Sequence, residues 1–313
     1  MTSHVPNGLT PAETAALTRR VTLLSVGAAA VLMSLKLVVW LLSGSVAVMA
    51  SMADSALDLV ASLATFFAVR YAVAPPDREH RFGHGKAEAF ASLMQAGLVF
   101  ASAALIGREA VQRLFDPQPI AREGWAIGVM IVSTFLTLGL VRAQTAVLRK
   151  TASVAVSGDR AHYFSDLASN LVALVGIAGT AFLGVAGLDA LAGMVIAALL
   201  VWGAISVFRE AAAQLMDHEL PEEARRQIVE LMTQDPRLTD VHQLRTRASG
   251  PFVHIQMHVD LDPELTLEAS HRVIVEAEKR LLAAFPSADI LIHADPRGRA
   301  EPHGGAFAER ADA

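Results

Sequence analysis

The sequence predicts a membrane protein with an all-α transmembrane domain of six helices and, after it, a small cytoplasmic α+β domain. The 313 residues are 53% hydrophobic and only 18% charged, with a mean hydropathy of +0.42, whereas soluble domains carry about 25% charged residues. Six apolar runs approach or exceed the roughly 20 residues that cross a bilayer as a helix. The runs stop near residue 217, where charged and turn-forming residues return. A soluble protein with large buried helices is the alternative that this composition disfavours.

The apolar runs define the order of the predicted spans. They cover residues 21–42, 46–72, 88–107, 125–141, 167–186 and 188–208. The polar residues 1–20 are expected to form a cytoplasmic segment, and residues 21–216 the six-helix transmembrane domain. The first run is too long for the core of a signal peptide, so we expect it to remain as a span.

The basic residues of the loops predict the orientation, because cytoplasmic loops carry an excess of Lys and Arg. With a cytoplasmic N-terminus, three such residues lie outside, namely Arg108, Arg113 and Arg122, and Lys36 falls within a span. The inside segments then hold eleven, namely Arg19, Arg20, Arg70, Arg78, Arg81, Lys86, Arg142, Arg149, Lys150, Arg160 and Arg209. Both termini are therefore predicted to be cytoplasmic.

Residues 217–296 have the pattern of a small α+β domain. Pro221 followed by two glutamates is typical of a helix start, and "PFVHIQMHVDLD" alternates between apolar and polar residues as a strand does. With "DVHQLRTRASG", "TLEASHRVIVEAEKRLLAAF" and "ADILIH" the order becomes α-β-β-α-β, which predicts a three-stranded sheet. The polar tail, 297–313, is expected to be disordered.

Two pairs of metal-ligating side chains belong to the second and fifth predicted helices, the second pair directly before the fifth apolar run. Asp54 and Asp58 are four residues apart, as are His162 and Asp166, so each pair shares one helix face. A carboxylate at bilayer depth costs at least about 2.5–3.5 kcal/mol, and a bound cation relieves that cost. Three oxygens and one nitrogen suit Zn²⁺, and also Fe²⁺, Co²⁺, Mn²⁺ or Cd²⁺. Hydrogen bonding to neighbouring helices, or snorkelling, is the alternative.

Two further groups of candidate ligands lie outside the spans. The loop "DREHRFGHGKAE" offers Asp77, His80 and His84, although histidines in loops are often merely solvated. The C-terminal domain is rich in histidine, and strand periodicity puts His254 and His258 on one face of the sheet. The other candidates there are His242, His271, His293 and Asp295. A solvated sheet face is the alternative for this second group.

Several classes of function are disfavoured by what the sequence lacks. Cysteine is absent, which excludes disulfides and thiolate ligands. The net charge of −5 and the pI near 6.1 give no indication of nucleic-acid binding. A membrane-embedded metalloenzyme is disfavoured because no H-E-x-x-H motif occurs and no Ser, Cys or Lys nucleophile is placed beside a base.

Six motifs give the chain a family resemblance. They are "MADSALDL", "HRFGHGKAEAFASL", "GDRAHYFSDLASN", "LMDHELP", "VHQLRTRASGPF" and "LIHADP", in this order across residues 50–296. The sequence resembles the cation diffusion facilitators, most closely their bacterial ferrous-iron/zinc efflux branch. The resemblance implies a homodimer in the bacterial inner membrane, in which each protomer has a ferredoxin-like cytoplasmic domain.

The resemblance also implies roles for individual residues. Asp54, Asp58, His162 and Asp166 match the family's transport site, and Asp77, His80 and His84 match a loop site. His242, His258, His271, His293 and Asp295 match a two-metal site that bridges the cytoplasmic domains. Lys86 and Asp217 match a charge pair at the dimer contact. His254 is outside the family pattern, and Ala294 stands where related proteins can carry a ligand.

The sequence thus predicts export of a divalent transition metal, such as Zn²⁺, Fe²⁺ or Cd²⁺, in exchange for protons. A ligand must lose its proton to bind metal, so protons and metal compete, and histidine exchanges protons near neutral pH. The metal is expected to act as substrate and bound regulator, with no organic cofactor. A metal-sensing or metal-gated membrane channel is the alternative function.

Overall fold

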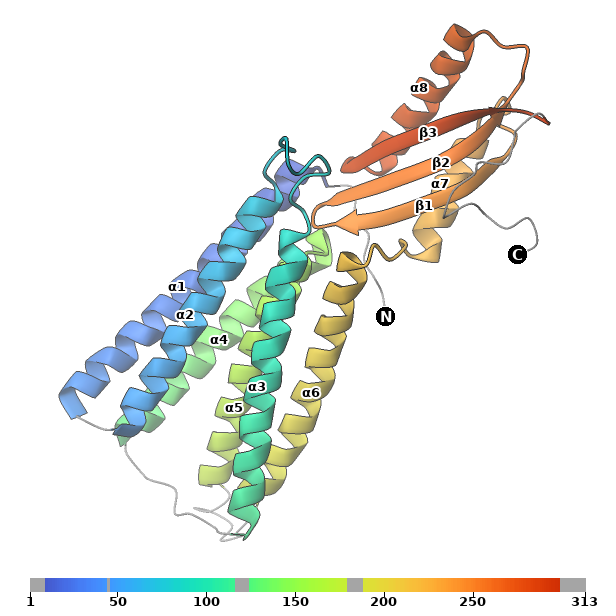
Figure 1. The fold of residues 1–313 in the computed structure, drawn as a ribbon. Helices are drawn as coiled ribbons and strands as arrows, with labels where there is room; N and C mark the ends of the chain where they lie inside the picture. Colours follow the sequence, from blue (N-terminus) through green and yellow to red (C-terminus); the bar gives the residue numbers. More distant parts are fainter. Residues whose placement is uncertain (1–8, 44–45, 116–123, 179–187, 299–313) are drawn as a thin grey trace. The chain divides into compact units, whose positions relative to one another are not determined.

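The structure is a computed structural model that describes residues 9–43, 46–115, 124–178 and 188–298 (Figure 1). The chain divides into two compact units, a helical unit over Leu9–Asp217 and a mixed unit over His218–Ala248 and from Phe252 onward. The end of the fifth apolar run and most of the tail predicted to be disordered lie outside the described residues.

The helical unit confirms the predicted helical transmembrane domain. Its described helices are α1 (Pro11–Ser43), α2 (Val46–Ala72), α3 (Ala87–Phe115), α4 (Gly124–Thr151), α5 (Val154–Ala178) and α6 (Leu188–Leu215). Within the described residues, five of these helices, all except α5, contain segments long and apolar enough to cross a membrane.

Two of the helices, α1 and α5, begin at least ten residues before their apolar runs. α1 begins at Pro11 rather than at 21, because Thr10 and Glu13 form a reciprocal capping box: the Glu13 amide donates to Thr10 Oγ1 at 3.3 Å, and the Thr10 amide to Glu13 Oε2 at 2.9 Å. α5 begins at Val154 rather than at 167. Ser153 caps it by accepting from the Val156 amide at 3.3 Å.

α5 is the central helix of this unit and contacts all five of the others. Its polar first half is buried, since Asp159 is 0% and Tyr163 1% exposed. A close approach to α3 requires the glycine at 158, because a Cβ there would lie 2.9 Å from Cα of Ser92. A search for apolar runs misses the start of α5 because this part of the helix is polar. Its polar side chains are buried and form hydrogen bonds with protein groups instead of water.

The mixed unit confirms the predicted small α+β domain with a three-stranded sheet. It contains α7 (Glu222–Thr233), β1 (Val241–Ser249), β2 (Phe252–Leu261), α8 (Leu267–Ala284) and β3 (Ala288–Pro296) in the predicted order (Figure 1). The sheet order is β1-β2-β3, and β2 pairs in parallel with β3. That parallel pairing requires a crossover connection, which α8 supplies.

Both helices of the mixed unit cover the same face of the sheet. Alternate residues of β2, including Ile255 and Met257, are buried in one core with Ile228 of α7 and Leu281 of α8. Since side chains alternate along a strand, His258 of β2 lies on the opposite face. The core therefore determines which face of the sheet carries the polar residues.

Candidate metal sites

Three of the four predicted transport-site residues meet inside the helical unit. His162 of α5 lies with Nε2 3.0 Å from Oδ1 of Asp58 on α2 and 3.9 Å from Oδ2 of Asp166, one turn further along α5. One ligand atom from each residue lies within 4.8 Å of the other two. The His162 ring is almost fully buried, at 4% exposure. Two carboxylates and one imidazole therefore face a common point between two apolar helices.

Asp54, the fourth predicted residue, is close to this group without joining it. It lies one turn before Asp58 on α2 and lines the same cavity, of about 450 Å³, as Asp58 and Asp166. Its carboxylate is not among the ligand atoms within 4.8 Å of one another. Coordination by all four residues stays a prediction, and it requires the Asp54 side chain to turn toward the group.

A buried polar network, which the sequence analysis missed, lies one turn before His162 on α5. Oδ2 of Asp159 accepts hydrogen bonds from Ser25 Oγ at 2.6 Å and Gln144 Nε2 at 2.8 Å. Oδ1 accepts from Gln95 Nε2 at 3.2 Å. The donors come from α1, α4 and α3, so the network ties α5 to three helices. Its only sequence indication was a second acid on the same helix, Asp159, three residues before His162.

Tyr163 extends this network toward α2. Its hydroxyl donates to the Ser25 carbonyl at 3.1 Å and lies 2.7 Å from Ser62 Oγ. Because Tyr163 follows His162 directly, these contacts restrict the rotation of α5 about its axis. They position the imidazole of His162 against α2 without touching it.

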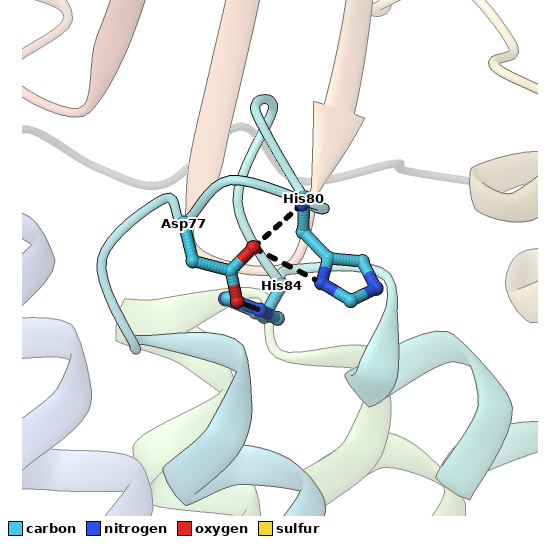
Figure 2. A group of neighbouring side chains, drawn as sticks. All are labelled: Asp77, His80 and His84. Atoms are coloured by element: carbon cyan, nitrogen blue, oxygen red, sulfur yellow. Dashed lines mark hydrogen bonds and ion pairs between the residues drawn. The ribbon is translucent and has the colours of Figure 1, made fainter.

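The loop residues Asp77, His80 and His84 form a second group, shown in Figure 2. The Asp77 carboxylate lies between the two rings, with Oδ1 3.3 Å from His80 Nδ1 and Oδ2 3.2 Å from His84 Nε2. His84 is buried, at 6% exposure, and packs against the ring of Tyr71. The loop thus holds one carboxylate and two imidazoles within reach of one ion.

Hydrogen bonding keeps the loop carboxylate ionised. The backbone amide of His80 donates to Oδ1 of Asp77 at 2.6 Å, and that of Glu79 at 2.9 Å. The bond from His80 makes the largest contribution in lowering the pKa of Asp77 to about 2. A carboxylate that is charged at neutral pH is a ready metal ligand.

A third group lies on the polar face of the sheet, around Asp295 of β3. Its Oδ2 lies 2.9 Å from His258 Nδ1 and 3.3 Å from His242 Nε2, and its Oδ1 lies 3.4 Å from His293 Nε2. Burial alone would raise the pKa of Asp295. The hydrogen bond with His258 and the nearby imidazoles outweigh that effect, and the pKa is lowered.

The register of the sheet explains which residues join the group around Asp295 and which do not. β2 and β3 pair His258 with His293, and Val259 with Ala294. Ala294 therefore lies on the face opposite His293. His271 is exposed on α8, which packs on the core face, and it does not join the group. His254 is four residues before His258 on β2 and pairs with Asp289, at 3.2 Å from Nδ1 to Oδ2.

The predicted charge pair is present within the helical unit. Lys86 Nζ lies 3.0 Å from Oδ1 of Asp217 and also donates to the Leu215 carbonyl at 3.2 Å. It thereby connects the residue before α3 to the end of α6. Asp217 has a positive φ of 55°, which aspartate tolerates better than most residues just after a helix.

Comparison with known proteins defines the class. Residues 22–216 match the family described as the cation efflux transmembrane domain, and residues 220–297 match the cytoplasmic domain of cation efflux proteins. The chain therefore belongs to the cation efflux family: it is a multi-pass membrane transporter that exports cations. This confirms the resemblance predicted from the six motifs.

The relatives cover nearly the whole chain. The cation-efflux pump FieF of Serratia proteamaculans is 38% identical over 282 residues, which is 90% of this chain and 94% of the relative. FieF of Yersinia enterocolitica is 40% identical over 268 residues, or 86% and 89%. A solved structure of CzrB in its zinc form, 31% identical, covers 27% of this chain and 98% of its own, with a TM-score of 0.25.

Proposed function

We propose that the exported cation is a divalent transition metal, of the Zn²⁺, Fe²⁺ or Cd²⁺ class, and that it is exchanged for protons at Asp54, Asp58, His162 and Asp166. The observation that carries this proposal is the group of His162, Asp58 and Asp166 between α2 and α5. Imidazole and carboxylate are ligands of these metals, and burying them without a cation or protons is costly.

The exchange follows from the competition between metal and protons for the same atoms. Nε2 of His162 must lose its proton before it can bind the metal, and the carboxylates must be ionised. Metal binding from the cytoplasm therefore releases protons, and protons that enter from the other side displace the metal. Helix movement about the site would expose it to each side in turn.

The groups outside the spans support a regulatory role for metal. We propose that Asp77 with its two histidines, and Asp295 with its three, bind metal and favour one arrangement of a homodimer. The match to the cytoplasmic domain of the family supports this assignment. Within one chain His271 does not join the group around Asp295. If His271 binds metal, the other ligands must come from a second copy of the chain.

We propose that both termini are cytoplasmic and that the membrane is the bacterial inner membrane. The excess of Lys and Arg in the segments that then face the cytoplasm supports this orientation. It places the loop group and the sheet group on the side from which metal is loaded.

Proteoliposomes with an internal metal indicator and an internal pH indicator test the central proposal. We expect saturable Zn²⁺, Fe²⁺ or Cd²⁺ flux with opposite movement of protons, and its loss in Asp54→Ala and His162→Ala. His218→Ala is the matched control, because this exposed histidine belongs to none of the three groups. Flux that persists in both site variants would refute the assignment, and flux that does not saturate and moves no protons would support the channel.

A further inference from the structure

A lysine on α1 shares the cavity of the transport group. Lys36 lines the cavity of about 450 Å³ together with Asp54, Asp58 and Asp166. Its ammonium donates hydrogen bonds to Ser55 Oγ at 2.7 Å and to the Ser51 carbonyl at 3.1 Å. The two acceptors lie on α2 on either side of Asp54 in the sequence. The lysine is thus held beside the acidic residues by the helix that carries two of them.

The hydrogen bonds do not cancel the charge of this lysine. Both acceptors are neutral oxygens, and among the described residues no carboxylate is in direct ion-pair contact with Lys36. A lysine inside a membrane span is costly, and such residues mark ion pathways. Because this cavity lies between apolar helices, the field of the ammonium reaches the nearby carboxylates with less screening than in bulk water.

The ammonium of Lys36 does not lie at the end of either helix. Lys36 lies seven residues before the end of α1, which corresponds to about 10 Å along the helix. Ser55 lies nine residues after the start of α2, about 13 Å from that end. The ammonium therefore lies between the helix ends, level with the turn of α2 that carries Asp54.

We propose that Lys36 is a tethered counter-ion of the transport site, a specificity-determining residue that sets how tightly the divalent cation is held. Its positive charge stabilises the carboxylates when no metal is bound. The same charge repels a divalent cation, which weakens metal binding and promotes release. The inference rests on the proposed function, since it concerns the affinity of that site.

The test compares two variants of Lys36 in the full chain, reconstituted in proteoliposomes with Zn²⁺ as the probe. Lys36→Met keeps an unbranched side chain, one atom shorter, and removes its charge, whereas Lys36→Arg keeps the charge. We expect Lys36→Met to lower the KM for Zn²⁺ about tenfold, equivalent to about 1.4 kcal/mol, and to lower the maximal rate because release slows. Lys36→Arg should keep a KM within about twofold of wild type.

Other outcomes overturn the inference. An unchanged or raised KM in Lys36→Met, or the same KM change in both variants, would show that charge is not the determinant. If Lys36→Met fails to fold, Ser55→Ala, which removes one hydrogen bond of the tether, must change the KM for the proposal to survive. Asp54→Ala separates the two proposals. If the Asp54→Ala variant transports Zn²⁺ normally, the proposed function fails. If Asp54→Ala loses transport while Lys36→Met keeps the KM of wild type, only the inference about Lys36 fails.

Discussion

The packing of α5 against α3 predicts that a single methyl group at Gly158 will impair the protein. A Cβ at this position would lie 2.9 Å from Cα and 3.0 Å from Oγ of Ser92, and 3.1 Å from Cβ of Gln95. Carbon atoms in contact normally stay about 3.5–4.0 Å apart. The Ser92 hydroxyl can rotate away, but its Cα belongs to the backbone of α3, so the two helices must separate.

The magnitude follows from two opposing effects in Gly158→Ala. Overpacking of a tight interface costs about 1–3 kcal/mol. Alanine favours a helix over glycine by about 1 kcal/mol, which offsets part of that cost. We expect the free energy of unfolding to fall by up to about 2 kcal/mol. We also expect a higher KM for Zn²⁺, because His162 lies one turn further along the displaced helix.

The assay is thermal unfolding of the purified protein in detergent, combined with transport kinetics. Gly97→Ala on α3 is the matched control, since a Cβ there has nothing within 4 Å. We expect Tm to fall by several degrees in Gly158→Ala and to stay level or rise in Gly97→Ala. Equal Tm and KM values in the two variants would refute the close contact between α3 and α5.

Three further predictions concern charged side chains. Asp159→Asn places an amide where the carboxylate accepts three hydrogen bonds. Thermal unfolding should show a free energy of unfolding lower by about 1–3 kcal/mol, and an unchanged Tm would contradict the network. The side chain of Arg237 lowers the pKa of Asp235 from 3.8 to about 2, so this contribution to stability is present above pH 3.8 and lost as the pH falls toward 2. Arg237→Ala should therefore have a lower Tm than wild type at pH 7, and the difference in Tm should shrink in acid. A difference in Tm that stays constant with pH would contradict this role of the ion pair. Lys86→Met removes a half-exposed ion pair with Asp217 and should lower stability by less than about 1 kcal/mol; a larger loss on thermal unfolding would show that this ion pair does more than join α3 to α6.

Local sequence patterns were sufficient to predict much of the fold. Apolar runs located the transmembrane helices, and alternation along "FVHIQMHVDLD" identified both β2 and its polar face. The four-residue spacing of His162 and Asp166 placed both on one side of α5. These predictions succeed because helical and strand periodicity depend only on neighbours in the chain.

Predictions failed or were missing where the environment comes from distant segments. The start of α5 was placed too late because its polar residues are buried against other helices. Asp159 was overlooked because its three donors lie on α1, α3 and α4. No local pattern records a hydrogen bond between residues that are far apart in the sequence.

The sequence by itself determined the architecture, the family and the residue types available to bind a metal. Only the tertiary structure decided which of them meet: Asp58 joins His162 and Asp166 while Asp54 does not, and His271 is kept away from Asp295. It also decided that Lys36 shares the cavity with the carboxylates. The physical reason is that spacing along a helix or strand fixes only which face a side chain occupies, whereas helix packing and strand register bring faces together.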